Sequence, residues 1–224
     1  MKELTDTKLL IINRNTTSDY DTLSSWILSL GSGLYRATNS LTVSRSNVAR
    51  HYDLSNALFA AFLSPDMTYS CPIWSSPDDS LEAAQKTKLL RITKEARIKS
   101  SDHVLEIGTG WGSFAILAVQ TTGCTVTSIT LSSEQKEEAE ARIAKSGLSD
   151  KIEVRLQDYR EVKGKFDKIV SIEMIEHVGR ENLAEYFRTV DRLLDEKIGV
   201  AVFQTSTMPD TVGIPFGLHS GRIC

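Results

Sequence analysis

The sequence lacks a long hydrophobic run, and its N-terminal part holds only a four-residue apolar stretch at residues 9–12. A signal peptide needs an apolar region of roughly 7–15 residues, and a membrane-spanning helix needs about 20. Neither is expected in this chain. Any contact with a membrane is therefore expected to be peripheral.

Cysteine is also scarce, since Cys71, Cys124 and Cys224 stand far apart without a Cys-x-x-Cys pair or a Cys/His cluster. This pattern predicts neither a zinc site nor a disulfide framework, and it indicates a reducing, cytoplasmic compartment. An excess of positive charge is missing as well, because the formal net charge is −3 at pH 7. The overall charge therefore disfavours nucleic acid as a partner.

What is present is the composition of a globular protein, with 41% hydrophobic and 25% charged residues. Apolar residues at helical spacing predict amphipathic helices near residues 21–35 and 54–62. Asp79, with Glu82 three residues later, is expected to cap a third helix that runs to about residue 98. Residues 1–98 are thus interpreted as an N-terminal helical segment.

From residue 99 onward, short apolar runs alternate with helical patterns. Strands are expected at residues 103–108, 124–130, 151–158, 166–174 and 199–206, with helices at 113–122, 132–147 and 181–196. The alternation predicts an α/β fold, a doubly wound parallel sheet wrapped by helices. Residues 207–224 show no periodicity and are expected to form a loop. Because such a domain normally continues, the core at residues 99–224 is expected to be incomplete at its C-terminus.

A glycine-rich turn, "VLEIGTGWGSFA", follows the first of these strands. Glycine there allows positive φ and close approach of a ligand, although a tight turn without a ligand would have the same glycines. A dinucleotide fingerprint would need Gly or Ala where Ser113 stands, and an acid near Thr130 at the end of the second strand. NAD is therefore disfavoured. Glu106 followed by three alternating glycines is instead usual in methyltransferases that use S-adenosylmethionine (SAM).

A SAM site needs a group that holds the ribose hydroxyls, and Gln135 is the candidate. Ser132-x-x-Gln135 also fits a capping box, in which both side chains serve the helix N-terminus. The two roles are compatible if Ser132 caps the helix while Gln135 points to the ligand. The sequence leaves both interpretations open.

Five stretches in unbroken order resemble one family, the cyclopropane-fatty-acyl-phospholipid synthases, which include the mycolic acid cyclopropane synthases. The likeness runs from about Asn47 to Gln204 and is carried by "HYDLSNALFAAFLSPDMTYSCPIW", "VLEIGTGWGSFA", "TSITLSSEQ", "LQDYREVKGKFDKIVSIEMIEHVG" and "YFRTVDRLL". It implies SAM as the methyl donor and an unsaturated acyl chain, such as that of a phospholipid, as the acceptor. It also implies that residues 1–98 cover the cofactor and lipid site.

The resemblance assigns a set of residues to the binding of SAM. These are the loop residues Glu106, Ile107, Gly108, Thr109, Gly110, Trp111, Gly112 and Ser113, the methionyl contacts Tyr69 and Ser70, the ribose-side residues Thr130, Leu131 and Gln135, and the adenine-side residues Tyr159 and Arg160. Tyr52 would stand close to the sulfonium, where an aromatic face attracts a cation.

The resemblance also implies how catalysis would proceed. Cys71 and Glu176 match family residues that surround a bound bicarbonate. An alkene that attacks the SAM methyl leaves a carbocation, and the bicarbonate would then act as the base that removes a proton from the new methyl. Apolar walls such as Phe59, Phe62 and Trp74 would keep water from the cation.

Several features put parts of this catalytic site in question. From composition alone, Cys71 is as readily a buried core thiol, and Glu173 is either a satisfied strand-end carboxylate or a further site residue. Gln204 stands where the best-known members have a bicarbonate-binding histidine, and an amide does not carry a proton at neutral pH. The proton-accepting site is therefore expected to be altered. Thr109, where the family often has cysteine, is expected to matter little.

The predicted function is methyl or methylene transfer from SAM to the double bond of an unsaturated acyl chain. Family members continue with two more strands, so the chain is expected to be truncated at its C-terminus. One alternative is a methyltransferase that acts on an unsaturated or nucleophilic secondary metabolite. Another is a non-catalytic SAM-binding partner that dimerises with a full-length relative, and a homodimer is also open.

Overall fold

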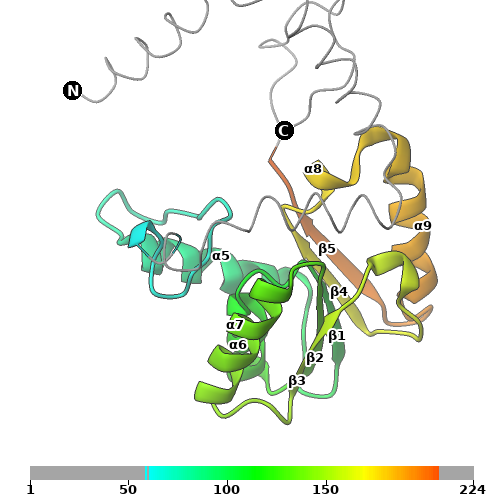
Figure 1. Ribbon diagram of the computed structural model, residues 1–224, viewed down its shortest axis with the longest axis horizontal. Helices are drawn as coiled ribbons and strands as arrows, with labels where there is room; N and C mark the ends of the chain where they lie inside the picture. The colour runs from blue at the N-terminus through cyan, green and yellow to red at the C-terminus, as the bar shows by residue number, and fades with distance from the viewer. Residues whose placement is uncertain (1–58, 60, 207–224) are drawn as a thin grey trace, which may run out of the picture. The chain divides into compact units, whose positions relative to one another are not determined.

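The computed structural model describes residue 59 and residues 61–206, which all belong to one compact unit, Ser44–Cys224 (Figure 1). The helix expected near residues 21–35, most of the helix expected at 54–62, and the loop at 207–224 lie outside the described residues. The same holds for Tyr52 and Cys224.

One sheet of five parallel strands forms the centre of the described fold. The strands are β1 (His103–Ile107), β2 (Thr125–Thr130), β3 (Ile152–Leu156), β4 (Lys168–Ile172) and β5 (Val200–Gln204). Their order is β3-β2-β1-β4-β5, with every neighbouring pair parallel. The five predicted strands and the doubly wound α/β class are therefore confirmed. The order reverses between β1 and β4, and ligands of such sheets bind at the carboxyl ends of the strands beside this switch point.

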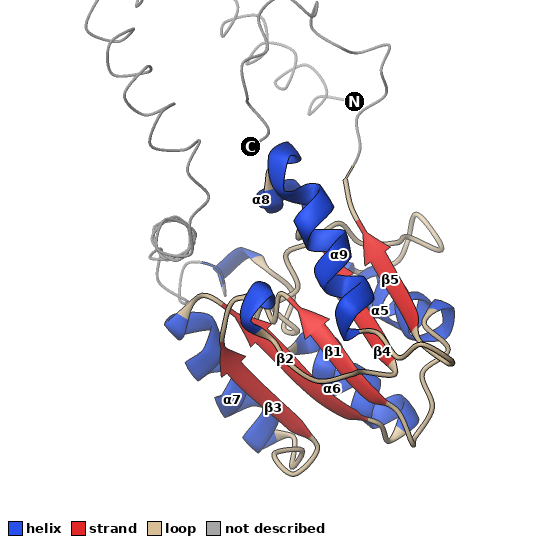
Figure 2. Cartoon of the chain, turned by 90° about the vertical axis from the view of Figure 1, so that its right-hand side faces the viewer, coloured by secondary structure: helices blue, strands red, loops and turns tan. Residues whose placement is uncertain are grey.

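Helices cover both faces of the sheet (Figure 2). On one face lie α5 (Leu81–Glu95), α6 (Ser113–Thr122) and α7 (Ser133–Lys145), and on the other lies α9 (Leu183–Leu193), with the short α8 (Ile175–Val178) after β4. Alternate residues of each strand supply the two cores. Val104 packs in the cluster under α5 and α6, whereas Leu105 packs with Tyr186 and Leu193 of α9.

The helix N-termini show which caps the sequence located correctly. Ser132 caps α7 as predicted, because its Oγ accepts the N–H of Gln135 at 3.1 Å. The prediction that Asp79 caps α5 was wrong. Ser80 is the cap and accepts the N–H of Ala83 at 3.2 Å, while the Asp79 carboxylate accepts the N–H groups of the preceding loop at Ser75 and Ser76.

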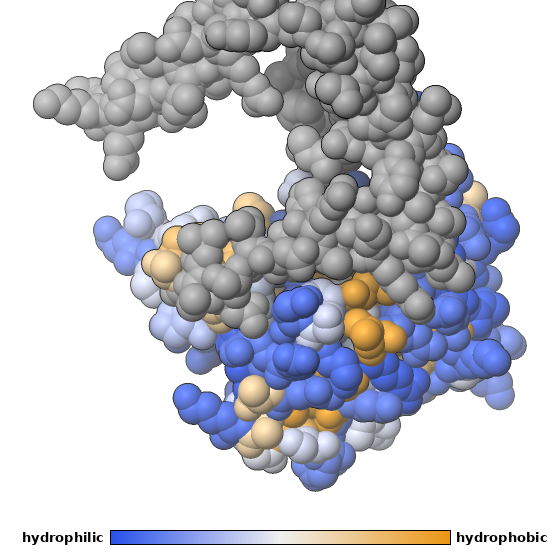
Figure 3. Space-filling model, in the orientation of Figure 1, coloured by the Kyte–Doolittle hydropathy of each residue, from blue (hydrophilic) through white to orange (hydrophobic). Residues whose placement is uncertain are grey.

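The visible surface of the described part is mostly hydrophilic, interrupted by compact apolar patches (Figure 3). In the described part of the chain, no helix is both long and apolar enough to cross a membrane. Cys124 is fully buried in the core, and neither it nor Cys71 forms a disulfide.

Candidate active site

The glycine-rich turn lies between β1 and α6 at the switch point of the sheet. Gly108 and Gly110 have φ of +99° and +52°, a region that other residues adopt only with strain. A Cβ on Gly108 would lie 3.0 Å from Met174 Cγ, and one on Gly110 would lie 3.4 Å from Tyr69 Cε1. The turn therefore has glycine where its backbone meets the segment after β4 and the segment before α5.

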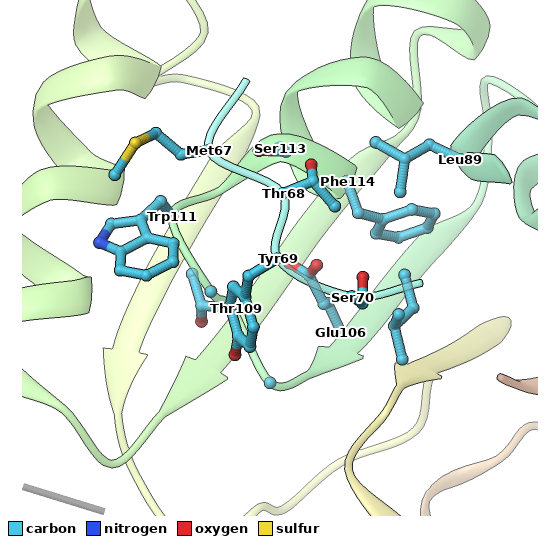
Figure 4. A pocket seen from close by; sticks show the side chains of 13 residues that line it. Met67, Thr68, Tyr69, Ser70, Leu89, Glu106, Thr109, Trp111, Ser113 and Phe114 are labelled. Atoms are coloured by element: carbon cyan, nitrogen blue, oxygen red, sulfur yellow. The ribbon is translucent and has the colours of Figure 1, made fainter. Parts of the chain in front are cut away.

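The strap, defined as residues 67–71, crosses in front of this turn (Figure 4). Tyr69 stands edge-on to Trp111, with ring centroids 5.1 Å apart, and remains 44% exposed. Between strap and turn lies a cavity of about 40 Å³. It is lined by Met67, Thr68, Tyr69, Ser70, Leu89, Glu106, Gly108, Thr109, Gly110, Trp111, Ser113, Phe114 and Ile172. The structure thus brings the predicted methionyl residues and most of the predicted loop into one site.

Helix α5 holds the strap from behind through two buried polar side chains that the sequence analysis missed. Gln85 Nε2 donates to the carbonyls of Thr68 and Ser70 at 3.2 and 2.8 Å, and Lys88 Nζ donates to Ser70 Oγ. Lys88 is fully buried. Burial lowers the pKa of Lys88 to about 8, against the opposing attraction of the Glu173 carboxylate. The sequence signal that could have identified them is their spacing: Gln85 and Lys88 are three residues apart on the same helix face as the apolar Leu89 and Ile92.

Glu106 lies under the turn as a buried carboxyl group, 2% exposed. Its Oε2 accepts the hydroxyl of Ser128, its register partner on β2, at 2.5 Å, and that hydroxyl also lies 2.7 Å from Thr109 Oγ1. Burial raises the pKa of Glu106 to about 8, although the Ser128 hydrogen bond works in the opposite direction. Thr109 therefore takes part in the polar chain that holds the acid of the motif.

At the end of β2 and the start of α7, Ser132 and Gln135 have different roles. Ser132 provides the cap, while the Gln135 side chain does not return to it. Instead, Gln135 Oε1 accepts the hydroxyl of Thr130 at 2.8 Å. Gln135 is 4% exposed, and its Nε2 has no hydrogen-bond partner among the described residues. A buried amide that lacks an acceptor is what a ligand with hydroxyl groups would satisfy. Leu131 lies between these residues and is half-buried.

The predicted adenine-side residues do not line the cavity. Tyr159 is 7% exposed and packs edge-on against Tyr186, with 5.1 Å between ring centroids. Asp158, which the sequence analysis did not single out, accepts three hydrogen bonds of 2.9 Å from Arg160. This pair fixes the turn after β3. The signal for Asp158 was an acid directly after a predicted strand.

Glu173, which follows the cavity residue Ile172, is the centre of a hydrogen-bond cluster that does not include Glu176. Glu173 Oε1 accepts the N–H of Cys71 at 2.7 Å and Nε2 of Gln204 at 2.8 Å. Gln204 Nε2 also lies 3.5 Å from the carbonyl of Cys71. Cys71 is exposed, so its interpretation as a core thiol was wrong. The structure therefore brings the strap, β4 and β5 together on one carboxylate.

Glu176 has different partners from Glu173. Its Oε1 accepts the hydroxyl of Thr205 at 2.7 Å and the N–H of Ser206. Burial acts to raise the pKa of Glu176, but these hydrogen bonds outweigh it, so the pKa lies below its ordinary value. The other oxygen, Oε2, is buried without a partner in the described range. Within that range, no group of three or more His, Cys, Asp or Glu residues could hold a metal ion.

The chain is similar in sequence to known methyltransferases and synthases. The tuberculostearic acid methyltransferase UfaA1 of Mycobacterium tuberculosis is 44% identical over 176 residues, which are 74% of this chain and 40% of that protein. The cyclopropane-fatty-acyl-phospholipid synthase of Escherichia coli is 43% identical over 144 residues, 64% of this chain and 36% of its own length. The chain thus spans less than half the length of these relatives.

A solved structure of mycolic acid cyclopropane synthase CmaA1, complexed with SAH and CTAB, aligns with a TM-score of 0.68 and 32% identity. The alignment covers 71% of this chain and 55% of that one. The family model for mycolic acid cyclopropane synthetase matches residues 39–217, well over half of the sequence. The chain belongs to the mycolic acid cyclopropane synthetase family.

Proposed function

We propose that the chain binds SAM across the carboxyl ends of β1 and β2 and transfers its methyl carbon. The observation that carries this proposal is the buried Nε2 of Gln135, which lacks a hydrogen-bond partner in the described part of the chain and follows β2 near the switch point of the sheet. The SAH complex of a 32% identical relative supports the same ligand. SAM would supply an electrophilic methyl group on a sulfonium centre.

The proposed contacts follow the chain from the strap to β3. Tyr69 and Ser70 would contact the methionyl part, and residues 106–113 would form the floor. Thr130, Leu131 and Gln135 would hold the ribose, with the turn at Tyr159 and Arg160 beyond it. Small-molecule sites usually enclose roughly 300–1,000 Å³, far more than the cavity of about 40 Å³ under the strap. We therefore expect the strap to shift on binding, and Trp111 fluorescence to report that shift through its contact with Tyr69.

We infer that the methyl acceptor is the carbon–carbon double bond of an unsaturated acyl chain. A row of aromatic rings leads from the exposed surface to the turn: Phe62 lies 5.8 Å from Phe59, which lies 4.9 Å from Trp111. Such an apolar path suits an acyl chain and excludes water from a carbocation. Two relatives, a tuberculostearic acid methyltransferase and a cyclopropane-fatty-acyl-phospholipid synthase, support the same class of acceptor.

We further propose peripheral contact with a lipid surface at the outer end of this path, where Phe62 is 61% exposed. Co-sedimentation with vesicles of unsaturated phospholipid should fall when Phe62 is replaced by Ser. The matched control is Phe187→Ser, since Phe187 is also exposed but lies on α9. An equal loss of co-sedimentation in both variants would refute the proposed role of this surface in lipid binding.

Two measurements test the function as a whole. Isothermal titration calorimetry with SAH should show binding, and its absence would refute the SAM site. SAM labelled in its methyl group, incubated with cis-unsaturated phospholipid vesicles, should yield labelled cyclopropyl or methyl-branched chains, with saturated vesicles as control. SAH binding without transfer to lipid would instead favour a non-catalytic partner of a longer relative, and transfer only to small nucleophiles would favour a secondary-metabolite methyltransferase.

A further inference from the structure

The bicarbonate that the family resemblance implies does not fit the residues of this chain. Its donors would be the Cys71 N–H and the side chain at position 204. Both already donate to Glu173 Oε1, at 2.7 and 2.8 Å. A second anion placed there would lose these donors and would stand beside the charges of Glu173 and Glu176. Gln204, unlike histidine, brings no positive charge to offset that repulsion.

We propose that Glu173 is itself the catalytic base and replaces the bicarbonate with a carboxylate of the chain. This inference rests on the proposed function. In the reaction, the π electrons of the alkene form a bond to the SAM methyl carbon while the carbon–sulfur bond breaks and leaves SAH. The Glu173 carboxylate then takes one proton from that methyl, and the released C–H electron pair bonds to the cationic carbon and closes the ring.

The position of Glu173 in the fold suits a base at the methyl group. It directly follows Ile172, which lines the cavity, and its oxygen is bonded to Cys71, which directly follows the cavity residue Ser70. It also stands at the carboxyl end of β4, beside the switch point where the glycine turn follows β1. Glu173 and the Cys71 N–H that donates to it thus each adjoin a residue that lines the cavity.

The backbone of Glu173 is held in a strained conformation. Its φ is +49°, a left-handed conformation that a Glu side chain adopts with strain, and its N–H is bonded to the carbonyl of Gln204 at 2.8 Å. Strained residues of this kind cluster at functional sites. Gln204 therefore fixes Glu173 twice, through its carbonyl and through its amide, and neither group titrates near neutral pH.

Two variants distinguish a reaction in which Glu173 is the base from one in which bicarbonate is the base. Glu173→Gln keeps the shape and the hydrogen-bond acceptor but cannot take the proton. Glu173→Gly relieves the strain at positive φ and vacates the position of the carboxylate. Glu137→Gln, an exposed residue on α7, serves as the matched control. SAH affinity measured by calorimetry should change less than about twofold in all three, because the base does not bind the cofactor.

In carbon-dioxide-free buffer, the native chain should transfer methyl groups at the same rate with and without added bicarbonate. Glu173→Gln should lose about 100-fold or more, the contribution of a general base. Glu173→Gly should be equally slow but should recover at least about tenfold in millimolar bicarbonate. Native activity that depends on bicarbonate, or full activity of Glu173→Gln, would overturn the proposal.

A binding measurement keeps this inference separate from the proposed function. Titration of ¹³C-labelled bicarbonate followed by NMR should show no binding to the native chain and clear binding to Glu173→Gly. If the native chain transfers no methyl group to lipid, the proposed function fails. Bicarbonate that binds the native chain as tightly as Glu173→Gly would still refute the built-in carboxylate.

Discussion

Replacing Lys88 by Met should change how the stability of the protein depends on pH. Lys88 is fully buried, and its pKa is lowered from 10.5 to about 8, first by burial and against the attraction of Glu173, Asp66 and Cys71. Between these two values the unfolded chain binds the proton that the folded chain has released. Stability therefore rises with pH across this window, because the unfolded state holds more protons.

The magnitude follows from the shift. One pKa unit corresponds to about 1.4 kcal/mol, so the shift of about 2.5 units corresponds to at most roughly 3 kcal/mol that the folded state loses below pH 8. Between pH 7 and pH 10, about 2.5 kcal/mol of this loss is relieved. Methionine has a similar stem and no charge. The difference in unfolding free energy between the native chain and Lys88→Met should therefore move by about 2.5 kcal/mol over this range, in favour of the native chain.

Urea unfolding at pH 7, 8, 9 and 10 measures this difference, and contributions of other titrating groups cancel between the two proteins. Lys88→Met should also bind SAH more weakly at pH 7, because Ser70 loses the ammonium that positions it. The matched control is Lys86→Met, which removes an exposed lysine from the same helix and should show no such dependence on pH. A difference between the native chain and Lys88→Met that stays constant with pH would refute the reasoning.

Three further outcomes are expected. The pKa of Glu106 is raised to about 8 by burial, so the native chain should lose stability as pH rises from 4.5 to 8, whereas Glu106→Gln should lose much less in urea unfolding. Gln135→Leu should weaken SAH binding about 5- to 150-fold by calorimetry, since one hydrogen bond that leaves a buried partner unpaired is worth about 1–3 kcal/mol; Gln120→Leu, at an exposed position, should not, and equal losses would contradict the ribose role. Gly110→Ala should cost about 1–2 kcal/mol in urea unfolding because of its φ of +52°, whereas unchanged stability would show that the turn relaxes freely.

The sequence by itself determined the class of the fold and the position of its glycine turn. Strands and helices of the core appear as alternating local patterns, and each is stabilised mainly by residues that stand close in the chain. The glycine turn was readable for the same reason, since positive φ at Gly110 is a property of the local backbone. Ser132 was readable as a cap because capping joins residues only three apart.

The tertiary structure decided which groups share the site. Glu173 meets Cys71 across 102 positions of sequence and Gln204 across 31, so no local pattern marks it as the carboxylate at the centre. The sequence does not distinguish Lys88 from other lysines of its helix, and only the packing of the helix against Ser70 buries it. Tyr159 turned into the core instead of toward the cavity. Contacts between distant segments depend on how the elements pack, and periodicity along the chain carries no information about that packing.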